Sequence, residues 1–438
     1  MNPLASELNQ IIEKSNPHIF SMLSKVGKAL FFPKGILSQS AEAKEKAHRI
    51  NATIGIATES GQIMCFDSVM SSLHDIPASQ SLTYAPSFGI PALRRQWQKE
   101  IAAKNPSLHG KPISLPVVTC GVTHGVSLMA DLWVDPGDVV ILPRLMWGNY
   151  NMILNVRKDA RLSHYTLFND QGGFNLSDFE QVVQKEAAAN KKIVILLNFP
   201  QNPSGYSVSK DEAGAIVNIL IRVAEGGTRV IAVLDDAYFG LFYEEQTMKE
   251  SLFALLTGQH PNLLAIKLDG GTKEHFIWGL RIGFITYGAG GSGDKASLYE
   301  ALEKKTAGGV RGNISNASHL SQTIMLNSMS FPANQDEKDE KFNILKARAS
   351  KVKSVLADAK YDAAWQAYPF NSGYFMCLRL KTVQAEALRL HLLDRYGVGL
   401  IALGKYDLRV AFSCIDEVQI EELYDTILQG IKDLEAVA

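Results

Sequence analysis

Three short polar segments could carry out chemistry together, because each directly follows an apolar run that predicts a strand. They are NFPQNPSG (198–205), VLDDAY (233–238) and LDGGTKEHFIWGLRIGF (268–284). Polar groups at the carboxyl ends of neighbouring parallel strands face one crevice, where open α/β sheets bind ligands. We therefore expect that crevice to hold an amide, a carboxylate, a phenol, an amine and a guanidinium, from Asn202, Asp235, Tyr238, Lys273 and Arg281.

This set of groups suits a phosphorylated carbonyl cofactor. Pyridoxal phosphate needs a lysine amine for its carbonyl, an acidic partner for its ring nitrogen and a cup for its phosphate. The three segments resemble those of fold-type I pyridoxal-phosphate enzymes of the class I/II aminotransferase family. Each segment alone is common, but all three in this order are hard to reach by chance. The resemblance covers the chain from about residue 50 to about residue 415.

The resemblance implies a role for each residue around the cofactor ring. Lys273 holds the cofactor covalently and, once released, becomes the base that moves a proton. Asp235 pairs with the pyridine nitrogen; its neighbour Asp236 competes for this role, and the spacing to Tyr238 favours Asp235. Tyr238 and Asn202 hydrogen-bond the phenolic oxygen of the ring.

The phosphate is expected at the segment TCGVTHG (119–125), where a glycine-bearing turn leads into an apolar run that predicts a helix. Free backbone N–H groups and the positive end of the helix dipole bind anions at such a point. The resemblance assigns N–H groups of Val122 and Thr123 to the phosphate, together with the Thr123 hydroxyl. The guanidinium of Arg281 is expected to donate two parallel hydrogen bonds to the phosphate.

One departure from the family concerns the phosphate. Many relatives carry a serine three residues before the lysine, and this chain has Gly270 there. That serine usually donates a hydrogen bond to the phosphate. Thr272 or His124 could replace it, and otherwise the phosphate is held less tightly.

The substrate site is assigned by the same resemblance. Arg409 grips the α-carboxylate of the substrate with two parallel hydrogen bonds. Gly55 lets the backbone approach the substrate, which Asn202 also contacts, and Trp147 stacks on the cofactor ring. The segment FFPKGI (31–36) is either a lid over the pocket or a static arm. Two residues with a weaker match in this region are Asn371 and Tyr374.

Two matches imply a homodimer with shared active sites. Tyr84 resembles the tyrosine that reaches the phosphate of the neighbouring subunit. Arg311 resembles the arginine that binds a side-chain carboxylate across the dimer in aspartate-type relatives. The two prolines usual after that motif are Ala317 and Ser318 here, so the segment could aim Arg311 elsewhere.

Size and pattern predict an α/β fold with two domains. A chain of 438 residues exceeds one compact core. Strand-like and helical runs alternate over residues 79–330, which predicts a large cofactor-binding domain with a mostly parallel sheet covered by helices. Residues 1–78 and 331–438 are predicted to form a smaller α+β domain with an N-terminal arm or lid.

Charge and composition exclude several classes of partner. The chain has 44 basic and 45 acidic residues, so its net charge of −1 gives no general attraction to nucleic acid or to an anionic membrane. The apolar runs are too short to span a bilayer, and no secretory signal is visible. The four cysteines lack metal-ligand spacing. We expect a cytoplasmic protein with reduced cysteines and no metal site.

One glycine-rich segment could mislead. GAGGSG (288–293) fits a dinucleotide-binding loop between a strand and a helix. A dinucleotide fold needs a second strand after that helix, ending in an acidic residue. Here the chain continues into TAGGVRGNISN (306–316), which does not predict a strand. A surface turn is therefore favoured.

The sequence predicts transamination between an L-amino acid and a 2-oxo acid such as 2-oxoglutarate. Aspartate or glutamate is the expected donor, because Arg311 could bind their side chains, and aromatic donors are an alternative. A β-lyase or a decarboxylase on the same fold is the nearest rival, since the cofactor residues do not separate these reactions. A non-enzymatic regulator that binds the cofactor is disfavoured, because no helix-turn-helix extension or basic patch is present.

Overall fold

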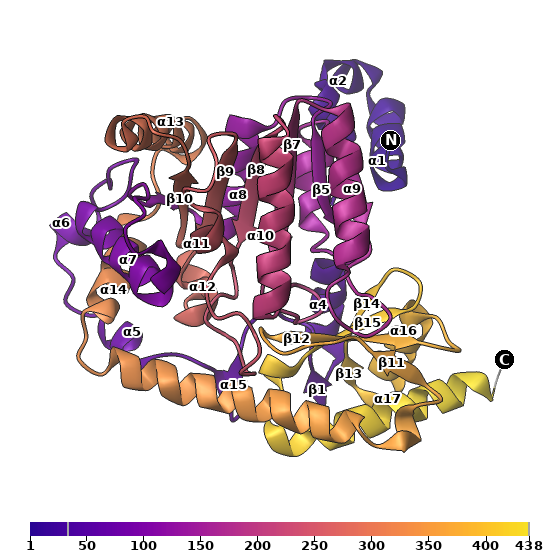
Figure 1. Cartoon of the computed structure of the whole chain (residues 1–438). Helices are drawn as coiled ribbons and strands as arrows, with labels where there is room; N and C mark the ends of the chain where they lie inside the picture. The colour runs from indigo at the N-terminus through magenta and orange to yellow at the C-terminus, as the bar shows by residue number, and fades with distance from the viewer. Residues whose placement is uncertain (33–34, 437–438) are drawn as a thin grey trace.

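The computed structural model describes residues 1–32 and 35–436, and its centre is a seven-stranded sheet. The strands are β4 (Val117–Thr119), β5 (Val139–Pro143), β6 (Arg161–Tyr165), β7 (Lys192–Asn198), β8 (Arg229–Asp235), β9 (Leu263–Asp269) and β10 (Gly283–Ala289). Their order across the sheet is β4-β10-β9-β8-β7-β5-β6. Figure 1 shows this sheet standing between helices.

The prediction of a mostly parallel sheet is confirmed. β5, β6, β7, β8 and β9 pair in parallel, whereas β10 runs antiparallel to both β4 and β9. The central strands β7 and β8 are buried along almost their whole length, as continuous apolar runs predict for strands covered on both faces. An apolar run does not encode strand direction, so the reversal of β10 could not be read from it.

Helices cover both faces of this sheet. They are α7 (Pro91–Lys104), α8 (Gly121–Trp133), α9 (Leu176–Ala189), α10 (Lys210–Glu225), α11 (Leu252–Leu256) and α13 (Lys295–Ile314). Side chains of a strand alternate between faces. In β8, Ala232 and Leu234 belong to the core shared with α7 and α10, whereas Val233 belongs to the core shared with α8. Asp235 and Asp236 therefore face opposite sides.

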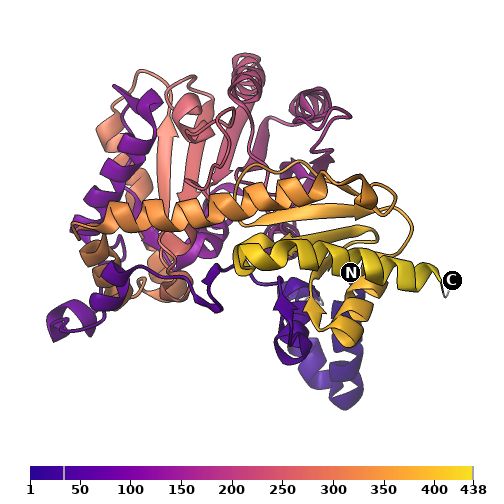
Figure 2. The same cartoon turned by 90° about the horizontal axis from the view of Figure 1, so that it is seen from below.

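A second, four-stranded sheet follows in the chain. Its strands are β11 (Trp365–Ala367), β12 (Phe375–Leu380), β14 (Ile401–Leu403) and β15 (Asp407–Ala411), paired antiparallel in the order β11-β12-β15-β14. The helices around it are α15 (Asn334–Leu356), α16 (Ala385–Tyr396) and α17 (Ile420–Glu435). Figure 2 shows α15 and α17 running side by side past this sheet. Strands and helices thus both occur within residues 331–438, as the α+β prediction for this part of the chain requires.

The N-terminal segment joins this second sheet through its backbone. β1 (Ile50–Asn51) pairs in parallel with β13 (Val398–Gly399), and the N–H of Ala411 donates a 2.9 Å hydrogen bond to the carbonyl of Ala52.

The domain boundaries near residues 78 and 330 stay a prediction. The expected lid over 31–36 includes positions 33 and 34, which lie outside the described residues. The other N-terminal elements are α1 (Pro3–Ser15), α2 (Pro17–Met22), α3 (Lys25–Ala29), α4 (Ile36–Lys46), β2 (Thr58–Glu59), β3 (Gln62–Ile63), α5 (Asp67–Ser71) and α6 (Ala78–Ser81).

The glycine-rich segment 288–293 contains the end of β10 at residues 288–289 and an exposed bend at residues 291–293, so the favoured surface turn covers only its second part. It connects antiparallel β10 to α13, and α13 leads into another helix, α14 (His319–Met329), so no dinucleotide-binding unit forms. Within residues 1–32 and 35–436, no helix is both long enough and apolar enough to cross a membrane. The same residues hold no group of three His, Cys, Asp or Glu side chains arranged for a metal ion.

Candidate active site

The expected crevice lies where β7, β8 and β9 end side by side. The backbone register pairs Asn198 with Asp235 and Asp235 with Leu268, so the segments that follow these strands start at one edge of the sheet. After β9 the chain makes a four-residue helix, α12 (Gly271–Glu274), that carries Lys273. The sequence prediction that these segments converge is therefore consistent with the strand order.

Lys273 is enclosed by aromatic rings and backbone. Its Nζ donates 2.8 Å to the carbonyl of Gly55 and lies 5.2 Å from the ring centre of Tyr238. The hydroxyl of Tyr374 donates 2.8 Å to the Lys273 carbonyl. Burial lowers the pKa of Lys273 to about 7, and the positive charges of Arg281 and Arg409 act in the same direction. A large share of this amine is thus neutral near pH 7.

Asp235 is held by hydrogen bonds. The hydroxyl of Tyr150 donates 2.5 Å to its Oδ2, and the N–H of Ala237 donates 3.1 Å to its Oδ1. The side chain of Asn198 donates 2.7 Å to its backbone carbonyl. Burial raises the pKa of Asp235 to about 6, although the Tyr150 hydrogen bond opposes the shift. The carboxylate therefore lies in a setting that favours a cationic partner.

The neighbouring Asp236 lies on the other face of the sheet and is already paired. The ammonium of Lys267 contacts its Oδ2, and the hydroxyl of Ser251 donates 2.6 Å to the same atom. A carboxylate neutralised in this way has no free capacity for a ligand cation. The geometry thus favours Asp235 over Asp236 as the partner of a cofactor ring.

The start of α8 and Arg281 form an anion-binding corner. A Cβ built on Gly121 would come within 2.5 Å of Arg281 Nη2, so the guanidinium lies against the first turn of α8. Val122 and Thr123, in this first turn, are partly buried. Free N–H groups of a helix start and an arginine fork together bind phosphate well. Val122, Thr123 and Arg281, the three residues predicted to contact the phosphate, therefore lie close together.

The glycine at position 270 is required by space. A Cβ there would come within 2.5 Å of the Ile282 carbonyl oxygen and within 2.8 Å of the Gly283 Cα. The serine that many relatives carry at this position has no room in this chain. Thr272, one expected substitute, donates its hydroxyl 3.3 Å to the Ile282 carbonyl. Its hydroxyl is therefore engaged with the backbone.

His124, the other expected substitute, has a free donor. Its Nδ1 accepts a 3.0 Å hydrogen bond from the N–H of Cys120, and burial lowers its pKa, so the neutral ring carries its proton on Nε2. That buried Nε2 has no hydrogen-bond partner within the described part of the chain. An anion at the start of α8 would satisfy it. Pyridoxal phosphate fits this site, because Asp235, Lys273 and this corner match its ring nitrogen, carbonyl and phosphate.

Arg409 is a buried cation that forms no salt bridge with the described residues of the chain. Its guanidinium stacks 4.2 Å from the ring centre of Phe375 and donates 2.8 Å to the Thr53 carbonyl and 3.3 Å to Asn202 Oδ1. Its Nε has no partner among residues 1–32 and 35–436, and burial lowers its pKa. A desolvated guanidinium is costly unless a counter-ion pairs with it. The site is therefore built to receive a carboxylate.

The remaining ring contacts lie around these groups. Tyr238 is buried, and a Cβ on Gly55 would stand 3.6 Å from its hydroxyl oxygen and 3.6 Å from Lys273 Nζ. The backbone at Gly55 therefore runs close to Lys273 and Tyr238, and its approach to a substrate stays a prediction. Trp147 packs edge-on against Tyr150 at 5.3 Å and borders a cavity of about 1050 Å³ beside α4. Its stacking on a cofactor stays a prediction.

Three predicted residues lie outside this cluster. Tyr84 is 88% exposed, and Arg311 is exposed in the last turn of α13, where it donates 2.7 Å to Ser315 Oγ. Both are free to face another molecule. Asn371 bonds through its side chain to the backbone of Ser207 at 2.8 Å in both directions, so it fixes the loop after β7.

Sequence reasoning missed Tyr150, Asn198 and Phe375. Tyr150 stands three residues after Trp147, and that helical spacing to a predicted cofactor contact was an available signal. Asn198 is the last residue of β7, and Phe375 directly follows Tyr374. Nothing in their local sequence separates the latter two from ordinary strand-end residues.

Comparisons with known proteins agree with this geometry. An aspartate aminotransferase of Bacillus sp. (strain YM-2) is 25% identical over 253 residues, which is 58% of this chain and only 60% of that protein. The crystal structure of an aminotransferase from Anaerococcus prevotii matches with a TM-score of 0.81 at 24% identity, over 93% of this chain and 98% of that one. A Pyrococcus horikoshii kynurenine aminotransferase, solved in complex with PMP, matches with a TM-score of 0.77 at 18% identity, over 95% and 98%.

Because both solved structures are less than 25% identical to this chain, they show only that the fold is shared. The family assignment comes from sequence, because the pattern described as aminotransferase class I and II matches residues 49–427, most of the chain. The matched range contains Asn202, Asp235, Lys273, Arg281 and Arg409. The chain therefore belongs to the aminotransferase class I and II family, whose cofactor is pyridoxal phosphate.

Proposed function

We propose that this protein is a pyridoxal-phosphate-dependent aminotransferase that moves the amino group of an L-amino acid to a 2-oxo acid. The observation that carries the proposal is the buried amine of Lys273, whose pKa burial lowers to about 7. It lies in one crevice with Asp235 and with the unpaired guanidinium of Arg409. Such perturbed groups gather at functional sites.

Each group of the chain has a distinct task. When bound, the cofactor supplies a carbonyl that condenses with amines and a ring that withdraws electrons. Asp235 would pair with the protonated nitrogen of the cofactor ring, and Tyr238 and Asn202 would hydrogen-bond the phenolic oxygen of the same ring. The neutral Nζ of Lys273 can take a proton from the substrate carbon that bears the amino group.

Arg409 sets the orientation of the substrate. A carboxylate that pairs with its guanidinium satisfies the free Nε and neutralises the buried charge. Gly55 gives the substrate room beside Lys273, because any side chain there would approach the amine and Tyr238. Val122, Thr123 and Arg281 hold the phosphate at the start of α8.

The active unit is proposed to be a homodimer. The hydroxyl of Ser87 donates 2.8 Å to the Ser315 carbonyl, and Thr83 Oγ1 lies 3.0 Å from His319 Nδ1. These contacts place the exposed Tyr84 segment beside the end of α13, which carries Arg311. Both predicted crossing residues thus belong to one surface. Exposed apolar side chains along it include Met70, Leu73, Leu82, Ile314, Leu320 and Phe331.

Aspartate or glutamate is the proposed amino donor. Arg311 of a second subunit would bind the side-chain carboxylate, and a desolvated arginine left without an anion costs about 2–5 kcal/mol. The Bacillus relative is named as an aspartate aminotransferase, which supports this choice. The Pyrococcus structure is of a kynurenine aminotransferase, so aromatic donors are the alternative.

An amino-donor screen with 2-oxoglutarate tests the activity directly. We expect purified protein to carry a near-visible absorption band, to form glutamate from 2-oxoglutarate, and to favour dicarboxylic donors. Release of ammonia or of carbon dioxide without glutamate would instead identify a lyase or a decarboxylase. Borohydride should bleach the band and fix the cofactor on Lys273; a peptide map with the label on another lysine would contradict the site.

The role of Arg311 is tested by Arg311→Ala. We expect kcat/KM for aspartate and glutamate to fall about 30-fold or more, because the side-chain carboxylate loses its partner, while neutral and aromatic donors are spared. An equal loss for every donor would show that Arg311 is structural and that Ala317 and Ser318 have redirected the segment.

Sharing across the dimer is tested by complementation. Lys273→Ala subunits mixed with Tyr84→Phe/Arg311→Ala subunits should regain one working site per heterodimer, since each supplies what the other lacks. The readout is activity after proven subunit exchange. No gain in activity over the separate variants would argue that each site is complete in one chain.

A further inference from the structure

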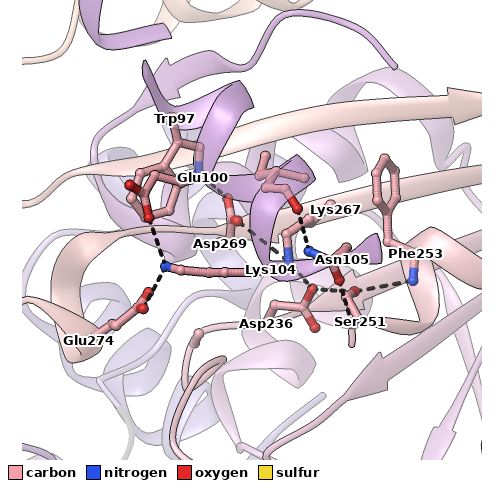
Figure 3. Close-up of polar contacts among 12 residues, drawn as sticks. Trp97, Glu100, Lys104, Asn105, Asp236, Ser251, Phe253, Lys267, Asp269 and Glu274 are labelled. Carbon is pink, nitrogen blue, oxygen red and sulfur yellow. Dashed lines mark hydrogen bonds and ion pairs between the residues drawn. The ribbon is translucent and has the colours of Figure 1, made fainter. Parts of the chain in front are cut away.

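A set of charged side chains lies on the α7 face of the large sheet (Figure 3), buried at Asp236, Lys267 and Asp269 and partly exposed at the others. We call it the charge network. Its charged members come from α7, from the ends of β8 and β9 and from α12, and they are Glu100, Lys104, Asp236, Lys267, Asp269 and Glu274. Neutral donors around it include Trp97 and Ser251.

The network links the ends of β8 and β9. The ammonium of Lys267 contacts Asp236 and lies 3.5 Å from Asp269 Oδ2. Burial disfavours its charge, yet the two carboxylates raise the pKa of Lys267 above its usual value. Asp236 directly follows Asp235, so this bridge holds the strand that carries Asp235 against the strand that leads to Lys273.

Helix α7 holds the other side of the same segment. The indole N–H of Trp97 donates 3.0 Å to Asp269 Oδ1, and Lys104 Nζ donates 2.6 Å to Glu274 Oε1. Lys104 also lies 3.4 Å from Glu100. Although burial opposes ionisation, the Lys104 charge lowers the pKa of Glu274 to about 2. The Lys104–Glu274 pair is therefore charged across the physiological pH range.

The segment that carries Lys273 has little regular structure of its own. α12 has four residues, follows Gly270 and begins with Gly271, and after it Phe276 and Arg281 have φ of 54° and 55°. A single helical turn is not stable alone, because few hydrogen bonds offset the cost of ordering it. Its position must therefore be set by contacts with its surroundings.

We propose that the Lys104–Glu274 ion pair is a positioning element that fixes Lys273 relative to Asp235 from the opposite face of the sheet. Glu274 is the residue directly after Lys273, so its anchor on α7 limits how α12 can turn or shift. The inference rests on the proposed function, because it assigns a geometric requirement of that reaction. Small displacements of a reacting group lower rates strongly.

Other charges near Glu274 do not replace Lys104. The charge of Lys338 also lowers the pKa of Glu274, but its ammonium pairs with Glu100 at 3.9 Å and makes no ion pair with Glu274 among the described residues. His275 is fully buried with neither ring nitrogen bonded among the described residues, and burial lowers its pKa well below its usual value, so it is neutral. The Lys104 ammonium is thus the group that anchors Glu274.

The test removes both charges together, in the double variant Lys104→Met/Glu274→Gln. This variant removes both charges of the pair, while Glu100, which also contacts Lys104, is partly exposed and keeps Lys338 at 3.9 Å. It therefore separates positioning from destabilisation better than either single change. We expect the melting temperature to stay near that of the wild type, kcat to fall about tenfold or more, and KM for the amino donor to change less than about twofold. The pH midpoint of the cofactor absorption band, which reports on the Lys273 amine, should also shift.

The matched control is Arg94→Met/Glu303→Gln. Arg94 lies on the same helix and pairs with Glu303 at 2.7 Å, with side chains 10% and 12% exposed, but this pair does not touch α12. We expect the control to keep the wild-type kcat and absorption midpoint whatever its stability. Lys104→Arg, which retains the charge, should keep most of the wild-type kcat.

The outcomes are distinct. A double variant with wild-type kcat and midpoint, or a control that lowers kcat as much, would overturn the positioning role. A wild-type protein that has no cofactor band and no transaminase activity would overturn the proposed function, and this inference with it.

Discussion

The two faces of the large sheet present the same kinds of side chain at the ends of β8 and β9 but treat their charges in opposite ways. On the α7 face, Asp236 and Asp269 share the ammonium of Lys267, so each of these carboxylates has a cationic partner within the chain. On the α8 face, Asp235 is bonded to a phenol and an N–H, and Lys273 donates to a backbone carbonyl. On the α8 face, Asp235 and Lys273 are therefore available to interact with charged groups of a ligand.

This difference appears in the acid–base properties of the two lysines. They are six residues apart, and Lys267 is buried whereas Lys273 is partly buried. The two carboxylates raise the pKa of Lys267, while burial of its amine and nearby arginines lower that of Lys273 to about 7. Burial alone therefore does not mark a functional lysine. What distinguishes the proposed functional lysine is an enclosed amine without an adjacent carboxylate, and this arrangement lowers the stability of the fold.

The largest effect expected from this comparison is on turnover. Lys273→Ala should lower kcat by on the order of 10⁴-fold or more, because the base and the covalent attachment are both lost, while the phosphate corner still binds cofactor. Lys267→Met, the matched change on the other face, should mainly lower the free energy of unfolding. Steady-state kinetics and denaturation of both variants check this; equal losses of turnover would erase the distinction between the faces.

The aspartate pair provides the next test. Asp235→Asn should lower kcat about 100-fold or more with little change in stability, because a protonated ring nitrogen loses its anion. Asp236→Asn should lower kcat by at most about tenfold but destabilise by up to about 3–5 kcal/mol, since the buried Lys267 loses its nearer carboxylate and keeps only Asp269, 3.5 Å away. Reversed effects would mean that Asp236 serves the cofactor.

Arg409 extends the test to the substrate. Arg409→Lys should lower kcat/KM for every amino donor about 30- to 1000-fold, because one ammonium cannot replace the two parallel hydrogen bonds of a guanidinium. The cofactor band and the melting temperature should change little. A loss restricted to dicarboxylic donors would instead assign Arg409 to the substrate side chain.

Most of the fold could be predicted from sequence because the strands are continuous apolar runs. The runs at 193–197, 230–234 and 263–268 lie within β7, β8 and β9. The direction of β10 was beyond reach, since IGFITYG has the same apolar pattern either way along the sheet. Turn chemistry was a better guide for the second part of 288–293, where glycine density indicated a surface turn.

The site was predictable where it depends on position along one segment. The family resemblance favoured Asp235 over Asp236 through the spacing to Tyr238. In the structure the two side chains lie on opposite faces of the sheet, because side chains alternate along a strand. The contacts that tie these segments to α7 were not predictable. Lys104 and Glu274 are separated by 170 residues, and neither has an unusual local sequence. Pairings of this kind depend on how helices pack, which a single sequence does not state.

The smallest expected effect is on the stability of the cofactor-free protein. The pKa of Lys273 falls from 10.5 to about 7 because burial disfavours its charge. Between these values the unfolded chain binds a proton that the folded chain does not, so the free energy of unfolding rises with pH across this window. Below pH 7 both states are protonated, and the penalty is complete. We expect Lys273→Met to exceed the wild type in stability there, by on the order of 2 kcal/mol.

Lys267 should behave in the opposite sense, which makes Lys267→Met the control. Its pKa is raised by Asp236 and Asp269, so its charge contributes stability that is complete below pH 10.5 and lost only above the folded pKa. Urea denaturation of the wild type and both variants at several pH values measures this. The advantage of Lys273→Met should shrink from pH 7 towards pH 10.5, while the deficit of Lys267→Met stays constant over that range. If both variants lost stability in parallel, Lys273 would be as well paired as Lys267, and the α8 face would not be held open for a ligand.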